Sequence, residues 1–322
     1  MNPLLKSILS PEFGFAILRV MTPLLFPAIG VAITALAGSI NIALEGIMLV
    51  SAFFGVIVSA FTGNLVLALL ASIAAGVGMG ALLGYFHLKL KADIILTAIA
   101  LNMFASGFTI FLLFLCTHDK GSTSSLKSLV FPEVNIPLLK SIPVLGPVVS
   151  GHNILTYCAF LAAIVFYILI FKTPFGLRIR AVGQNPNAAD SVGINVNRIR
   201  MYALMLSGFF GSLGGLYLSM GYVSWFSRDM TAGRGFIAIA AATLGWNMPL
   251  GTFLSSLLFG FVNAFAIYIA SLRIPSELIQ MIPYLVTVIA LTIFSIQAHR
   301  KKIIKSKQTR KKVEVLQAGG EM

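Results

Sequence analysis

Residues Gly46–Leu88 read GIMLVSAFFGVIVSAFTGNLVLALLASIAAGVGMGALLGYFHL and contain no Asp, Glu, Lys or Arg. A helix needs about 20 apolar residues to cross a bilayer, so this stretch is long enough for two crossings. Thr62-Gly63-Asn64 lies near its middle and supplies residues typical of a turn. Strands of a membrane barrel would alternate polar and apolar residues, whereas this run is continuous. The stretch therefore predicts two transmembrane helices joined by a short turn.

The rest of the chain repeats this pattern. Of its 322 residues, 58% are hydrophobic and 10% are charged, and the mean hydropathy is +0.94. A soluble domain carries about 25% charged residues and could not bury so much apolar surface in one core. We predict an all-α, polytopic transmembrane helix bundle. Its eight long spans are expected at 16–38, 42–61, 64–87, 93–115, 152–171, 201–221, 249–271 and 276–297.

The distribution of basic residues predicts how the chain is oriented. The net charge is +13, and most Lys and Arg residues lie in three stretches, 89–91, 172–200 and 298–322. The positive-inside rule places all three in the cytoplasm. Only three long spans lie between the second and third stretches, and an odd number of crossings would place these two stretches on opposite sides of the membrane. The short apolar segment 236–246 is therefore expected to cross as a broken or re-entrant element, which gives about nine crossings with the N-terminus outside and the C-terminus inside.

These crossings divide the chain into regions. We expect a short interfacial lead-in, one transmembrane domain and a basic cytoplasmic tail, at residues 1–15, 16–297 and 298–322. Within the domain, 116–151 forms the longest extracytoplasmic loop and 172–200 forms a cytoplasmic loop.

Several functional classes lack support in the sequence. Cys116 and Cys158 are the only cysteines, the histidines are scattered, and no metal spacing or catalytic constellation appears. The basic residues follow membrane topology, so nucleic acid is not an expected partner. No Gly-x-x-x-x-Gly-Lys-[Ser/Thr] phosphate loop occurs, so ATP would have to be hydrolysed by another chain. Glu45 is the only acid between long apolar runs, which disfavours an ion-coupled secondary transporter without excluding it.

The cytoplasmic loop contains the signals of a short helix. Asn185 is a good N-cap, Pro186 suits the first helical position, and Gly193 can end the helix. These residues predict a helix of about two turns. It is either a structured connection between two spans or a lever that presses on a cytoplasmic partner.

The same loop carries a family resemblance. Residues 176–196 read Gly-Leu-Arg-x-Arg-Ala-Val-Gly-x-Asn-Pro-x-Ala-Ala-x-x-x-Gly-Ile-x-Val, and Ser207-Gly208 and Gly214-Gly215 follow. This pattern resembles the permeases of the branched-chain amino acid, ribose and nucleoside class of ABC importers. The segment 41–48 is similar to a second motif of that class. The segments 233–238 and 283–287 look closest to its purine nucleoside and simple-sugar members.

The resemblance implies a role and a set of partners. The chain would be the permease subunit of an ATP-driven importer in a prokaryotic plasma membrane, and a purine nucleoside would be its cargo. A pentose or another simple sugar is the alternative. The chain would bind no cofactor, since ATP and Mg²⁺ belong to ABC ATPase subunits. The other partners would be a second permease, either a related chain or another copy, and an extracytoplasmic solute-binding protein. The coupling helix would comprise Asn185, Pro186, Ala188, Ala189, Asp190 and Gly193.

Polar residues within the spans are candidates for the translocation pathway, because such residues are costly in lipid. The candidates are Asn41, Glu45, Asn102, Trp246, Asn263 and Gln280. Some have a structural interpretation instead: Glu45 can cap a helix, and the amides can bond neighbouring helices. Trp225, Phe226 and Arg234 are expected at the outer mouth, where an interfacial aromatic belt is the alternative. Gly76, Gly80 and Gly84, like Gly211 and Gly215, are spaced for close helix packing.

Overall fold

The computed structural model describes residues 10–135, 145–221 and 223–269, together with 281, 285–289, 292 and 296. Almost every described element is a helix. The helices are α2 (Pro11–Leu36), α3 (Leu44–Thr62), α4 (Leu65–Gly84), the π-helix η1 (Tyr85–Lys89), α5 (Ile94–Thr117), α7 (Leu145–Val149), α8 (Ile154–Lys172), α9 (Pro174–Gln184), α10 (Pro186–Ser191), α11 (Val196–Met220), α12 (Arg234–Leu244) and α13 (Pro249–Ile269). The strands β1 (Glu133–Val134) and β2 (His152–Asn153) form one short antiparallel pair.

The all-α transmembrane prediction is confirmed. Among the described residues, 7 helices are long and apolar enough to cross a membrane. They correspond to the first seven predicted spans. The eighth, 276–297, lies largely outside the described residues, as does the tail 298–322. The total of about nine crossings therefore stays a prediction.

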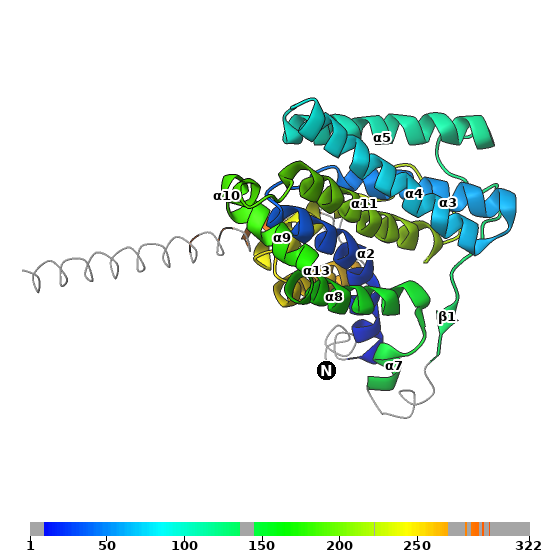
Figure 1. Cartoon of the computed structure of the whole chain (residues 1–322). Coiled ribbons are helices and arrows are strands. Elements are labelled where there is room, and N and C mark those ends of the chain that lie inside the picture. Colours follow the sequence, from blue (N-terminus) through cyan, green and yellow to red (C-terminus); the bar gives the residue numbers. More distant parts are fainter. Residues whose placement is uncertain are drawn as a thin grey trace, which may run out of the picture.

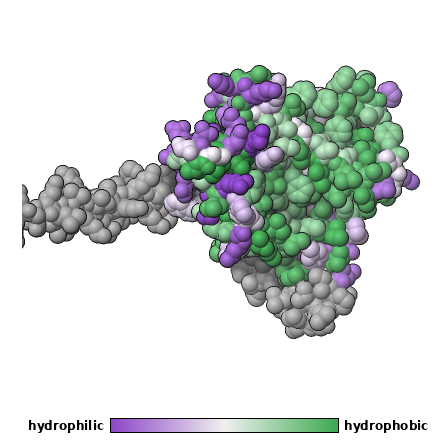
Figure 2. Space-filling view, viewed as in Figure 1, coloured by the Kyte–Doolittle hydropathy of each residue, from purple (hydrophilic) through white to green (hydrophobic). Residues whose placement is uncertain are grey.

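The most buried helices form the centre of the bundle. α2 and α11 lie side by side, while α5 and α8 lie on opposite flanks of this pair (Figure 1). The flanking helices expose large apolar side chains such as Leu96, Met103 and Leu161. Figure 2 shows the resulting surface, which is apolar over the body of the bundle and hydrophilic near α9 and α10. An apolar surface of this kind requires lipid or protein as its neighbour.

Glycine contacts bring the central helices together. A Cβ added to Gly208 of α11 would lie 2.3 Å from the carbonyl oxygen of Gly76 on α4, and one added to Gly80 would lie 2.5 Å from that of Leu204. On the other side, a Cβ on Gly215 would lie 2.1 Å from the carbonyl oxygen of Met48 on α3. These contacts confirm the prediction that Gly76, Gly80 and Gly215 serve helix packing.

The helices define two ends of the molecule. At one end, Phe15 near the start of α2 stacks on His152, with 3.9 Å between ring centroids. At the other, the end of α2 contacts α9, where Nε of Arg200 donates to the carbonyl oxygen of Ala37 at 3.3 Å. Lys89 and Arg198 line one groove at this second end. The first two basic stretches therefore lie on the same side, as their charge predicted.

The helices differ from the sequence prediction at the starts of α2 and α11 and in the presence of α9. α11 begins at Val196 rather than at 201, because the side chain of Asn195 accepts the amide hydrogen of Arg198 at 2.9 Å and caps the helix. α2 begins at Pro11, inside the predicted lead-in, because proline is well suited to the first turn of a helix. The loop 172–200 holds an additional helix, α9, that was not predicted. Its start is marked by Thr173, whose hydroxyl accepts the amide hydrogen of Gly176 at 3.1 Å, and by Pro174. These are the same signals that predicted α10.

Candidate functional site

The irregular segment between α2 and α3 is fixed by Asn41. Its Nδ2 donates to the hydroxyl of Ser207 on α11 at 3.0 Å, and its Oδ1 accepts the amide hydrogen of Ala43 at 2.9 Å. Its own backbone N–H donates to the hydroxyl of Thr34 at 3.1 Å. Asn41 is fully buried. The structure thus gives this predicted pathway residue a tertiary role, holding the chain where α3 begins.

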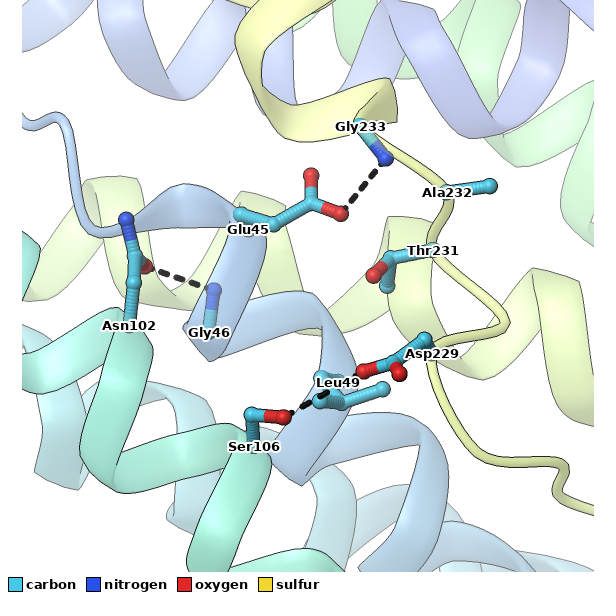
Figure 3. A pocket seen from close by; sticks show the side chains of 9 residues that line it. All are labelled: Glu45, Gly46, Leu49, Asn102, Ser106, Asp229, Thr231, Ala232 and Gly233. Carbon is cyan, nitrogen blue, oxygen red and sulfur yellow. Dashed lines mark hydrogen bonds between the residues drawn. The ribbon is translucent and has the colours of Figure 1, made fainter. Parts of the chain in front are cut away.

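Glu45, in the first turn of α3, binds the start of a different helix. Its two carboxylate oxygens accept the amide hydrogens of Gly233 and Gly235, both at 2.7 Å. Figure 3 shows the first of these bonds. These amides open α12, where a helix has unsatisfied N–H groups and a positive dipole end. Glu45 is therefore a helix cap, as one interpretation held, but it caps α12 rather than its own helix.

Gly235 is required by this contact. A Cβ at that position would lie 2.5 Å from the backbone nitrogen of Glu45 and 2.8 Å from its Oε2. The absence of a side chain lets the first turn of α12 approach the first turn of α3. Two helix N-termini thus meet at one carboxylate.

Asn102 fixes the start of α3 from the other side. Its Oδ1 accepts the amide hydrogen of Gly46 at 2.8 Å, and its Nδ2 donates to the carbonyl oxygen of Ile42 at 3.0 Å. Both ends of the amide are used, and they join α5 to α3. This is the helix-to-helix bonding that the sequence left open.

The site lies at the middle of the bundle. Asp229 precedes α12, and its Oδ1 accepts the hydroxyl hydrogen of Ser106 at 3.3 Å. Ser106 is central in α5, which runs from Ile94 to Thr117. The segment 223–233 therefore reaches mid-depth of the bundle, where α12 begins. α12, at about 1.5 Å per residue, then covers only about half of a bilayer core. Discontinuous helices at this depth are typical of transporter binding sites.

A cavity of about 150 Å³ opens where these segments meet. Figure 3 shows its lining residues, Glu45, Gly46, Leu49, Asn102, Ser106, Asp229, Thr231, Ala232 and Gly233. Of the predicted pathway residues, Glu45 and Asn102 line it. The sequence analysis missed Ser106, Asp229 and Thr231. A loop that dips into a bundle leaves no mark in hydropathy, although the polar stretch 227–234 between apolar segments was visible.

Trp246 and Asn263 do not line this cavity. Trp246 is half-exposed in the tight turn after α12, where its φ is +59°. Asn263 donates to the carbonyl oxygen of Phe259 in its own helix at 2.9 Å. Gln280 lies outside the described residues. Their assignment to the pathway stays a prediction.

The three residues expected at the outer mouth occupy different places. Phe226 is buried, with its ring centroid 5.3 Å from that of Phe53, and its N–H donates to the hydroxyl of Thr123 at 2.8 Å. Trp225 is partly exposed beside it. Arg234 lies deeper, at the start of α12, where Nη1 donates to the carbonyl oxygens of Met230 and Thr231 at 3.2 Å each.

The helix α10 lies at the basic end of the bundle. The side chain of Asn185 accepts the amide hydrogen of Ala188 at 3.1 Å, with Pro186 at the first position, as predicted. Ala189 is buried against the bundle and fixes the helix. Ala188 and Asp190 are exposed, as is Gly193, which adopts a φ of +83°. The side chain of Val192 is 75% exposed. α10 thus presents a small, partly apolar surface.

A bundle of apolar helices interrupted at mid-depth, with a capped helix at its basic end, defines a membrane transport subunit. Residues 14–291 match the family described as the permease component of the branched-chain amino acid transport system, and the chain belongs to this family. Family members are transport components and not enzymes.

Two relatives are close in sequence. The chain is 37% identical to the nucleoside ABC transporter permease protein NupC of Lactococcus lactis, over 85% of this chain and 89% of that protein. It is also 37% identical to the guanosine ABC transporter permease protein NupQ of Bacillus subtilis, over 84% and 88%. Among solved structures, PsaBC from Streptococcus pneumoniae in complex with Fab has a similar fold. Its TM-score is 0.50 at 14% identity, over 89% of this chain and 94% of that one.

Proposed function

We propose that this protein is the permease subunit of an ATP-driven importer for purine nucleosides. The nucleoside and guanosine permeases to which it is 37% identical support the cargo. A simple sugar is the alternative cargo, and the uptake experiment described below includes one. The single observation that carries the mechanism is α10, a capped helix that is anchored by Ala189 and exposes Ala188 and Val192.

In this mechanism, α10 docks on an ABC ATPase that binds ATP and Mg²⁺. An exposed Val192 at the end of a helix is suited to a protein partner, because burying it there removes apolar surface from water. The contact between Arg200 and Ala37 joins the start of α11 to the end of α2. A movement of α10 can therefore be transmitted to both central helices, which then expose the mid-depth cavity to alternate sides.

The remaining partners follow from the orientation. We place the end with α9 and α10 in the cytoplasm, the N-terminus outside and the C-terminus inside a prokaryotic plasma membrane. The basic groove of Lys89 and Arg198 supports this orientation. A solute-binding protein would then dock at the opposite end, where the segment 121–131 is hydrogen-bonded to Met220 and to the segment 226–228. A second permease, a related chain rather than another copy, completes the pathway.

The variant Ala188→Arg tests the coupling role. Ala188 is exposed, so arginine should leave the fold intact while it obstructs the docking surface. Ala189 is unsuitable because it is buried. Glu133→Arg, exposed at the opposite end of the bundle and outside the surface proposed for the solute-binding protein, is the matched control. We expect Ala188→Arg to lower ATP-dependent uptake at least tenfold with unchanged amounts in the membrane, and Glu133→Arg to retain it. Equal uptake by both variants would show that α10 does not form the coupling contact.

A further inference from the structure

We propose that the mid-depth cavity is a pentose subsite that recognises the ribose hydroxyl groups of the cargo through Thr231, Asp229 and Ser106. This inference rests on the proposed nucleoside cargo and extends it to a part of the substrate. It starts from an unsatisfied polar group. The side chain of Thr231 points into the space between Glu45 and Ser106 (Figure 3). Thr231 is only 2% exposed.

The hydroxyl of Thr231 has no hydrogen-bond partner among the residues that the structure describes, although the carbonyl oxygen of the same residue accepts bonds from Arg234. Since Thr231 is almost fully buried and lines the cavity, only water or a solute that enters the cavity can bond this hydroxyl. A solute hydroxyl in the cavity would satisfy it, as donor or as acceptor. The group is therefore positioned for a ligand rather than for the fold.

The other lining groups favour a ligand that donates hydrogen bonds. Among the described residues, Ser106 and Nε of Arg228 are the partners of the Asp229 carboxylate, at 3.3 and 3.2 Å, which leaves acceptor sites on both oxygens. The hydroxyl of Ser106 can in turn accept a bond. An acidic residue that accepts a ribose hydroxyl hydrogen is a recurrent arrangement in nucleotide-binding folds.

The size and composition of the cavity select the sugar over the base. Its volume of about 150 Å³ is below the usual range for pockets that enclose a whole ligand, so it fits only part of a nucleoside. Bases are generally held by stacking on aromatic or guanidinium faces. None of the described residues that line the cavity is aromatic or cationic. A non-planar, hydroxyl-rich pentose matches these walls better than a purine does.

The test compares cargoes that differ only in the sugar. The complete transporter, with its ATPases and solute-binding protein, is placed in proteoliposomes, and uptake of guanosine, 2′,3′-dideoxyguanosine and D-ribose is measured. The chain carries either wild-type Thr231 or Thr231→Val, which keeps the shape and removes the hydroxyl. Thr243→Val is the matched control, because that exposed hydroxyl bonds only the carbonyl oxygen of Ile239 in its own helix. The solute-binding protein is the same throughout, so its own preference cancels between variants.

We expect the wild type to import guanosine faster than the dideoxy analogue. Thr231→Val should reduce this ratio about fivefold, the effect of one hydrogen bond, and Thr243→Val should leave it unchanged. Asp229→Asn gives a second reading of the same ratio should the valine variant fail to fold. An unchanged ratio in folded Thr231→Val and Asp229→Asn overturns the pentose subsite and leaves the nucleoside function standing. Import of D-ribose without either nucleoside overturns the cargo and retains the subsite. Import of none of the three solutes overturns both.

Discussion

At the residue scale, the carboxylate of Glu45 is the centre of the site. It satisfies two amides at the start of α12 and lies at the start of α3, so it joins two interrupted helices. The sequence marked this residue correctly as an isolated acid in an apolar region. It could not reveal the partner, because Gly233 and Gly235 are 188 and 190 positions away. Distant backbone amides have no signature in a single sequence.

Replacing Glu45 by glutamine should detach the start of α12. The amide retains one acceptor oxygen, but its nitrogen is a donor and faces another donor. We expect a loss of about 2 kcal/mol and reduced transport, because charge-assisted bonds are replaced by one neutral bond. Thermal unfolding and uptake of Glu45→Gln, beside the exposed control Glu133→Gln, provide the measurement. A variant that matches the control in both would contradict the role of Glu45.

His152, in the strand β2 just before α8, gives a pH dependence. Burial lowers its pKa from the ordinary value of 6.5, while the bond from its ring to the carbonyl oxygen of Val148 opposes that shift. Below about pH 6.5 the unfolded chain binds a proton that the folded chain resists. Stability should therefore be constant above this pH and fall as the pH decreases below it. The variant His152→Phe keeps the stack on Phe15 and should flatten the melting temperature between about pH 5 and 7. If the melting temperature of the variant falls as steeply with decreasing pH, a group other than His152 causes the pH dependence.

At the scale of elements, the sequence predicted long helices better than short ones. The first seven spans and α10 were found, because apolar length and the pair Asn185-Pro186 are local signals. α9 was missed although Thr173-Pro174 carries the same kind of signal. The depth of the segment 223–233 could not be predicted, since its position depends on tertiary contacts with Ser106 and Glu45.

The crossing of α4 and α11 allows a matched pair of variants. Gly76→Ala would place a Cβ 2.7 Å from both the carbonyl oxygen of Gly208 and the Cβ of Ser212, whereas Gly78, on the same helix, faces open space. Overpacking of this kind costs about 1 to 3 kcal/mol. We expect Gly76→Ala to lower the melting temperature and Gly78→Ala to leave it unchanged or raise it slightly. Equal melting temperatures would show that the two helices can separate without cost.

At the scale of the whole molecule, the fold is an apolar bundle with two chemically different ends. The body requires lipid, and the end with α9 and α10 is hydrophilic (Figure 2). The basic residues of the segment 172–200 belong to this end, and the positive-inside rule supports our proposal that it faces the cytoplasm. Fold class and family could both be predicted from the sequence, since apolar windows and the loop motif are properties of the chain itself. The cavity could not, because it exists only where α3, α5 and the segment before α12 meet.

Cysteine labelling tests this orientation. The natural thiols are first removed by Cys116→Ser and Cys158→Ser, and single cysteines are then introduced as Ser125→Cys or Ala188→Cys, both at exposed positions. A membrane-impermeant maleimide should label Ser125→Cys in intact cells and Ala188→Cys only after permeabilisation. The reverse labelling pattern would show that the protein has the opposite orientation in the membrane.

The central claim is that this permease imports nucleosides through a partner's ATP hydrolysis, and one uptake measurement tests it most directly. Labelled guanosine is offered to proteoliposomes that hold the complete transporter, with ATP at the ATPase side. Uptake should require ATP and should disappear when the phosphate-loop lysine of the ATPase is replaced by alanine. Uptake that continues with the inactive ATPase would contradict the account and favour an ion-coupled transporter.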